Sequence, residues 1–184
     1  MATASAPSSL PRHPRPAAAR RRAARFAAVQ ALYQIELDGQ RPDFVVAEFG
    51  EHRLAQLLEP FDPEAPSPQV DQEWFRSLVT GAWAARERLD PEIEACLAPG
   101  WTLARCGFLL RACLRAGAFE LALRPEVPLR AVINEYIEVA RLFFAQPEVA
   151  FVNAVLDKLA PRLRPAEPAA PPAPEPPETE APPA

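Results

Sequence analysis

Four arginines near the start of the chain are the residues whose type and spacing could do chemistry. They are Arg20, Arg21, Arg22 and Arg25. A guanidinium stays charged at physiological pH, and its planar fork of donors fits the oxygens of a phosphate. An apolar pattern with helical spacing follows without a break, from Phe26 to Tyr33. Our hypothesis is that this helix start binds RNA, and the simpler alternative is an unspecific basic tail.

Three of these arginines share one side of the expected helix. At about 100° per residue, Arg21, Arg22 and Arg25 project toward the side that carries Val29 and Tyr33 further along. The side that enters the core therefore begins with guanidinium groups, which cannot be buried without partners. We expect the first turn to overhang the domain with its arginines facing outward.

Charge is unevenly divided along the chain. Residues 1–35 hold six arginines and no acid, residues 36–160 hold 12 arginines and lysines against 20 acids, and the whole chain has a net charge of −4. Because an acidic body repels phosphate, nucleic acid could be held only locally, at the arginines. The pattern argues against a long DNA duplex wrapped over the surface.

The residue types needed for catalysis or metal binding are sparse. His52 is the one histidine in the expected helical body, and neither a G-x-S-x-G nor an H-E-x-x-H motif occurs. Cys96, Cys106 and Cys113 are odd in number and lack C-x-x-C spacing, which argues against a zinc site or a disulfide framework. We therefore expect a binding protein that is not an enzyme, with no catalytic residues, no metal and no cofactor.

No apolar run reaches the roughly 18 residues of a membrane span. The N-terminus is rich in alanine and arginine and free of acids, as organellar transit peptides are. However, Pro7, Pro11, Pro14 and Pro16 would break the amphipathic helix that such a signal needs. Together with the cysteine pattern, this favours a cytoplasmic protein without a membrane partner.

Apolar residues recur with helical spacing through the middle of the chain, and no segment alternates with a period of two over the length of a strand. The expected helices cover 18–37, 43–59, 70–89, 90–97, 103–123, 129–144 and 147–161. Their ends follow turn and cap signals such as Asp90-Pro91 and Thr102. The fold class is all-α, a single bundle of about seven helices over 18–161. Disordered segments are expected on either side, an N-terminal extension over 1–17 and an acidic, proline-rich tail over 162–184.

Three features of the expected helices bear on packing and binding. The segment 103–123 is apolar on nearly every side, as a helix at the centre of a bundle is, and its Gly117 predicts close approach of a neighbouring helix. Asn134-Glu135 lies off the apolar stripe of its helix and is either a solvated face or a hydrogen-bonding pair. Phe151 lies at a helix start and is either a core residue or a surface on which an unpaired base stacks.

Six segments of the expected helical body occur in a characteristic order. They are AVQALYQIEL (28–37), WFRSLVTG (74–81), GWTLARC (100–106), LRAGAFEL (114–121), VINEYIEVA (132–140) and FVNAVLDKLAP (151–161). In this order, and over about residues 20–165, the chain resembles the NusB family of bacterial transcription antitermination factors. The resemblance implies an all-helical domain of two packed subdomains without enzymatic activity.

The resemblance also implies partners. The family binds boxA, a short single-stranded RNA element of ribosomal RNA and leader transcripts, as a heterodimer with the small-subunit ribosomal protein NusE. NusA, NusG and RNA polymerase join them in an antitermination complex that supports processive rRNA transcription. Whether the free protein forms a homodimer stays open.

Individual residues acquire roles from the same resemblance. The main RNA contact of the family falls here on Arg20, Arg21, Arg22 and Arg25, and further RNA contacts fall on Gln30 and Phe151. The ribosomal protein would lie near Tyr33, Leu110 and Arg111. The chain departs from the family pattern at Ala23, Ala24 and Phe26, where charge is common, so phosphate contacts would be fewer. Leu109 and Leu110 stand where relatives often have charged residues, so the partner interface would be more apolar.

Two other functions are compatible with the sequence. One is a helical protein-interaction adaptor, and the other is a stand-alone rRNA-binding module without an antitermination role, like the RNA-binding part of an rRNA cytosine methyltransferase. The sequence contains no counterpart of the cofactor-binding sheet that such an enzyme needs. An interaction adaptor, in turn, has no need of four arginines at one helix start.

Overall fold

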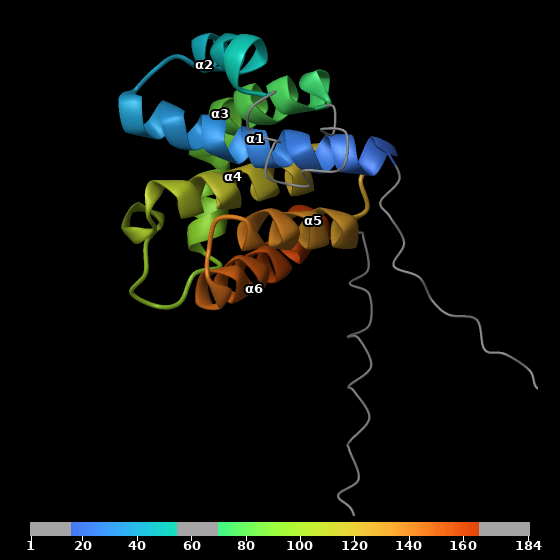
Figure 1. Ribbon diagram of the computed structural model, residues 1–184. Helices are drawn as coiled ribbons and strands as arrows, with labels where there is room; N and C mark the ends of the chain where they lie inside the picture. Colours follow the sequence, from blue (N-terminus) through green and yellow to red (C-terminus); the bar gives the residue numbers. More distant parts are fainter. Residues whose placement is uncertain (1–15, 55–69, 166–184) are drawn as a thin grey trace, which may run out of the picture.

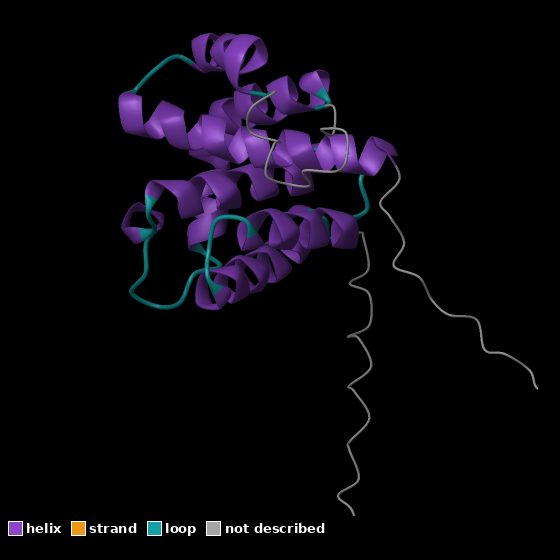
Figure 2. Cartoon of the chain, in the orientation of Figure 1, coloured by secondary structure: helices purple, strands orange, loops and turns teal. Residues whose placement is uncertain are grey.

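The computed structural model describes residues 16–54 and 70–165, which form helices and connecting loops without a strand (Figure 2). The α-helices are α1 (Pro16–Asp38), α2 (Pro42–Glu48), α3 (Gln72–Glu94), α4 (Phe108–Leu123), α5 (Leu129–Arg141) and α6 (Gln146–Leu163). A π-helical segment, Phe49–Arg53, continues α2, and a 3-10 turn, Leu103–Arg105, precedes α4. The all-α prediction is confirmed, with six α-helices in the described ranges where we expected about seven.

Helix α4 occupies the centre of the bundle, with α1 and α3 against one side and α5 and α6 against the other (Figure 1). All ten residues from Ala112 to Leu121 are buried, so the prediction of a central helix is confirmed. The predicted close approach at Gly117 is also confirmed, because a Cβ added there would lie 3.0 Å from Cδ2 of Leu156 on α6. One continuous apolar core joins the layer formed by α1, α2 and α3 to the layer formed by α4, α5 and α6.

Two predicted boundaries in the middle of the chain are wrong. Helix α3 does not end at Leu89 but continues through Pro91 to Glu94, because Leu89 and Ile93 are both buried and the Asp90 carboxylate binds Arg115 instead of capping a new helix. The predicted helix over 103–123 is interrupted at Cys106 and Gly107, whose extended backbone separates the 3-10 turn from α4. Thr102 does not cap the turn with its side chain.

The ends of the helical body extend beyond the predicted limits. Helix α1 begins at Pro16, and α6 continues through Pro161 to Leu163. Arg164, which we assigned to the tail, donates hydrogen bonds to the carbonyl oxygens of Val127 (2.7 Å), Arg124 (2.8 Å) and Glu120 (3.0 Å) and so satisfies the end of α4. The expectations for residues 1–15, 55–59 and 166–184 lie outside the described residues.

Over the ranges 16–54 and 70–165, no helix has the length and apolarity that a membrane span requires. The same ranges hold no cluster of three or more potential metal ligands.

Candidate RNA and partner interface

The start of α1 presents two arginines to solvent. Arg20 is exposed, and its carbonyl oxygen accepts the N–H of Asp71, which ties the first turns of α1 to the start of α3. The Arg21 side chain remains 45% exposed, although its guanidinium lies 4.3 Å from the ring centroid of Trp74 and 3.8 Å from the Asp71 carboxylate. Both side chains are therefore accessible to a ligand, and Arg21 can be reached while it rests on Trp74 and Asp71.

Arg22 is held by a carboxylate on α5. Its Nε donates to Oε2 of Glu135 at 2.9 Å and its Nη2 donates to Oε1 at 2.7 Å, while the side chain stays 38% exposed. These hydrogen bonds raise the pKa of Arg22 above its ordinary value. Arg22 is thus a cation at the rim of the domain that already has an anionic partner.

Arg25 is buried against two carboxylates. Its Nε donates to Oε1 and Oε2 of Glu120 at 3.2 and 3.0 Å, and its Nη1 lies 3.4 Å from Oε2 of Glu135. Tyr136 completes the cluster by donating its hydroxyl to Oε2 of Glu120 at 3.1 Å. Burial opposes the charge of Arg25, but the hydrogen bonds and negative charge of Glu120 outweigh it, so the pKa of Arg25 is raised. Burial, with the charge of Glu120, holds the pKa of Tyr136 well above 10.

The expectation that the arginine side of α1 faces outward is therefore wrong for Arg25 and only half right for Arg22. Arg25 is 3% exposed, and the partners that allow its burial come from α4 and α5, far along the chain. Sequence reasoning missed Glu120 as a site residue. The available signal was an acid within a helix that is otherwise apolar on nearly every side, since a buried carboxylate needs a cation or hydrogen-bond donors as partners.

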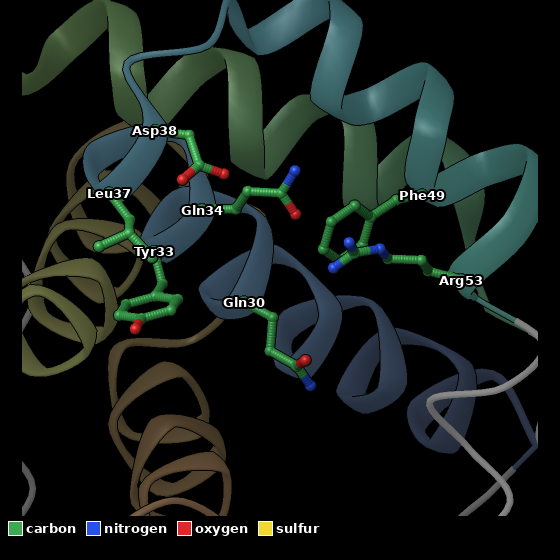
Figure 3. Close-up of a pocket in the computed structure, with 7 residues that line it drawn as sticks. All are labelled: Gln30, Tyr33, Gln34, Leu37, Asp38, Phe49 and Arg53. Atoms are coloured by element: carbon green, nitrogen blue, oxygen red, sulfur yellow. The ribbon is translucent and has the colours of Figure 1, made fainter.

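A shallow hollow of about 300 Å³ lies beside the second half of α1 (Figure 3). It is lined by Gln30, Tyr33, Gln34, Leu37, Asp38, Phe49 and Arg53. Its outer residues are open to solvent, with Tyr33 36% exposed and Leu37 53% exposed. Gln34 is more deeply set, because its Nε2 donates to Gln40 (3.1 Å) and Glu48 (3.0 Å). The hollow brings together one residue expected to contact RNA, Gln30, and one expected near the partner, Tyr33.

The other residues expected near the partner lie on α4, across from the end of α1. Arg111 donates its Nε to Glu36 at 2.9 and 3.0 Å and its Nη1 to the carbonyl of Leu103 at 3.3 Å, so only 13% of its side chain is exposed. Arg115 also contacts Glu36, and Leu110 is partly buried. Arg111 therefore fixes the end of α1, and only a small exposed part of its side chain could contact a partner.

Phe151 does not join the arginines. It lies early in α6, and α6 begins on the side of the molecule where α1 ends, away from the start of α1 (Figure 1). Phe151 is partly buried against the core, and its ring centroid lies 6.3 Å from that of Trp101. The sequence left two interpretations of Phe151 open, a core residue and an aromatic surface. Its packing against the core agrees with the first, and its partial exposure beside Trp101 leaves room for the second.

Comparison with known proteins agrees with this architecture. The family model described as NusB family matches residues 22–161. The transcription antitermination protein NusB of Sinorhizobium fredii is 46% identical over 144 residues, which cover 78% of this chain and 88% of that protein. The protein of the same name from Nitrobacter hamburgensis is 47% identical over 148 residues, which cover 80% and 90%.

Solved structures are similar over most of the described helices. NusB of T. maritima aligns with a TM-score of 0.58 at 27% identity, over 76% of this chain and 89% of that one. A chain from a crystal structure of the antitermination factors NusB and NusE in complex with dsRNA aligns with a TM-score of 0.58 at 25% identity, over 78% and 97%. On the match over residues 22–161 and on these relatives, the chain belongs to the NusB family of transcription antitermination proteins.

Proposed function

We propose that this protein binds single-stranded boxA-type RNA in rRNA and leader transcripts together with the ribosomal protein NusE, and so supports processive rRNA transcription. The observation that carries the proposal is the start of α1, where Arg20 and Arg21 are exposed and Arg22 is at the rim. The solved complex of NusB, NusE and dsRNA, to which this chain aligns, supports RNA and NusE as partners, and the single-stranded form of the RNA is part of the proposal.

The three accessible arginines would act differently. Arg20 and Arg21 bind phosphates directly, because neither is enclosed by a carboxylate. Arg22 exchanges the Glu135 carboxylate for a phosphate, since its two hydrogen bonds to Glu135 must loosen before it can bind RNA. Arg25 positions α1 from within the core and touches no phosphate. Gln30, at the edge of the hollow, continues the RNA contact along α1.

NusE would cover the second half of α1 and the facing start of α4. Tyr33 and Leu37 are the exposed apolar side chains on α1, and Leu110 supplies partly buried apolar surface on α4. The ion pair of Arg111 with Glu36 holds the two helices in register for that contact. NusA, NusG and RNA polymerase would then join the complex in the cytoplasm.

The test is fluorescence anisotropy of labelled boxA-like RNA with the full chain. A scrambled single strand and a double-stranded version of the same RNA serve as competitors. The variant Arg20→Ala/Arg21→Ala should weaken binding and should lower the slope of log affinity against log salt by roughly 0.7 for each lost phosphate contact. Arg88→Ala on α3 is the matched control, because Arg88 is also an exposed helical arginine but lies outside the proposed contact.

A second titration adds purified NusE. We expect NusE to tighten binding of the boxA-like RNA more than that of the scrambled RNA, and Tyr33→Ala to remove this gain while leaving binding of RNA alone unchanged. Equal affinity for both single strands, unaffected by NusE or by loss of Arg20 and Arg21, would contradict the proposal and favour a helical interaction adaptor.

A further inference from the structure

We infer that the acidic, proline-rich segment 166–184 docks on the arginines at the start of α1 and competes with RNA for them. The segment holds no lysine, arginine or histidine and four glutamates, Glu167, Glu175, Glu178 and Glu180. Its docking requires only charge and position, whereas the competition rests on the proposed function. The protein thereby carries its own competitor for the phosphates of RNA.

The acidic segment leaves the helical body close to these arginines. The end of α6 and the start of α1 lie on the same side of the bundle (Figure 1). Arg164, at the end of α6, donates its Nη2 to the carbonyl of Arg124 at 2.8 Å. The Cζ atom of Arg124 lies 4.6 Å from the centroid of the Trp74 ring, and the Cζ atom of Arg21 lies 4.3 Å from the same centroid. Two side chains, Arg124 and Trp74, thus connect the point where the segment begins to Arg21.

The arginines near this point have weak anionic partners. Among the residues that the structure describes, no carboxylate forms an ion pair with Arg20, which is exposed. Arg21 approaches the Asp71 carboxylate to 3.8 Å and Arg124 approaches that of Glu126 to 3.4 Å, whereas a strong charged N–H···O bond measures roughly 2.7–2.9 Å. Further carboxylates can therefore bind here without displacing a tight pair.

The acidic segment is long enough for its glutamates to reach α1. Glu175 follows Pro165, the last described residue, by ten positions, and a proline-rich chain extends by about 3.1 Å per residue, so the segment spans up to about 31 Å before Glu175. Helix α1, with 23 residues, is about 35 Å long in total. A tether of this length holds the glutamates near the arginines at a millimolar effective concentration, at which weak ion pairs are populated.

The charge of the remaining body directs the segment to the same place. Residues 36–160 hold 12 arginines and lysines against 20 acids. This excess of acids repels the glutamates of the segment, whereas the start of α1 attracts them. An intramolecular occupant is therefore favoured over a second copy of the chain, because the acidic bodies of two copies repel each other.

Competition of this kind acts on the phosphates of RNA and not on its bases. It should therefore lower the affinity for boxA-like and for scrambled RNA by the same factor. Because the contact is ionic and exposed, it weakens as salt is added. The salt dependence of RNA binding should become steeper once the competitor is removed.

The first experiment measures anisotropy of labelled RNA with the full chain and with a variant that neutralises the segment, Glu175→Gln/Glu178→Gln/Glu180→Gln. A control variant removes the same charge from exposed positions on α2, on the segment that continues it and on α3, Asp43→Asn/Glu51→Gln/Glu87→Gln. We expect the first variant to bind both RNAs about 3- to 30-fold more tightly at low salt, from three exposed ion pairs, and the control less than about twofold. The gain should disappear in the background Arg20→Ala/Arg21→Ala. Circular dichroism and thermal melting establish that each variant is folded.

A second experiment detects the docking without RNA. A spin label is attached through Ala181→Cys, since Cys96, Cys106 and Cys113 are buried. In low salt we expect the label to broaden the amide NMR signals at the start of α1 and to leave that of Leu37, at its other end, sharp. High salt, or neutralisation of the three glutamates, should restore the broadened signals.

Two results would overturn the inference. One is the absence of selective broadening at the start of α1. The other is an RNA affinity that does not rise when the segment is neutralised, or that rises equally in the control variant or in the background Arg20→Ala/Arg21→Ala. The proposed function is judged separately, because preference for boxA-like over scrambled RNA and its increase with NusE do not depend on the acidic segment.

Discussion

The guanidinium of Arg25 and the carboxylate of Glu120 form an ion pair inside the bundle. Arg25 is 3% exposed and Glu120 is fully buried, and their hydrogen bonds join α1 to the middle of α4. Tyr136 on α5 donates to the same carboxylate. The helix that carries the exposed arginines is therefore fastened, one turn further on, to the centre of the fold.

Removal of the Arg25 side chain should lower the free energy of unfolding, because Arg25 is part of the core and is not a direct RNA contact. Arg25→Ala leaves the Glu120 carboxylate buried without its cation, and breaking a buried pair in this way costs about 3–5 kcal/mol. Urea denaturation should detect this loss of unfolding free energy. Arg20→Ala, at an exposed position on the same helix, should change stability by less than about 0.5 kcal/mol. If Arg25→Ala is as stable as the unchanged protein but binds RNA poorly, Arg25 is a direct RNA contact and the buried role is incorrect.

The same pair indicates what the sequence could and could not predict. The all-α class, the central position of α4 and the apolar stripes follow from spacing along the chain, because helical periodicity is a local property. The pairing of Arg25 with Glu120 depends on two helices crossing, and no local pattern encodes that contact. Sequence reasoning therefore placed the arginines at the start of one helix but misassigned the orientation of Arg25.

Helix boundaries were the other source of error. The turn signals at Asp90-Pro91 are ordinary, yet burial of Leu89 and Ile93 keeps α3 continuous. Tertiary packing overrides a local signal when the residues on both sides of it belong to the core. Conversely, the uninterrupted apolar pattern before α4 did not reveal the break at Cys106 and Gly107.

The Glu135 carboxylate should compete with RNA for Arg22. Glu135→Gln weakens the two hydrogen bonds that hold Arg22, and partly exposed pairs of this kind contribute about 0.2–1 kcal/mol. We expect affinity for boxA-like RNA to rise by up to about fivefold at low salt, with a smaller gain at high salt. Glu138→Gln is the matched control, since it removes the same charge from α5 but pairs with Arg141. An equal gain for both variants would mean that general repulsion, not release of Arg22, is responsible.

Gly81 permits the packing of α3 against α4. A Cβ added at Gly81 would collide with the ring of Phe119, which is 7% exposed. Gly81→Ala should therefore lower the free energy of unfolding by about 1–3 kcal/mol, the usual cost of overpacking. The control Gly50→Ala meets no atom within 4 Å and should not destabilise the fold. A second change, Phe119→Leu, should recover part of the loss in Gly81→Ala, and no recovery would show that the cost arises elsewhere.

Stability should fall as the solution becomes alkaline, in part because of Cys113. Complete burial raises the pKa of the Cys113 thiol to about 12, whereas a cysteine in the unfolded chain ionises near pH 8.5. Below pH of about 8.5 both states keep the proton and the thiol adds no pH dependence. Above it the unfolded state loses the proton and the folded state retains it, so the free energy of unfolding decreases by up to about 1.4 kcal/mol per pH unit until about pH 12.

Urea denaturation between pH 7.5 and 10.5 is the measurement for this effect, with pH values chosen at about half-unit steps around the ordinary cysteine pKa. Cys113→Ala should be less stable at neutral pH, because it leaves a small cavity, but its stability should depend less steeply on pH. Tyr136 adds a decrease in the same direction above pH of about 10, because its pKa is also raised by burial. An identical pH slope in Cys113→Ala and the unchanged protein would show that the thiol ionises in the folded state, and that α4 opens to water far more readily than its burial implies.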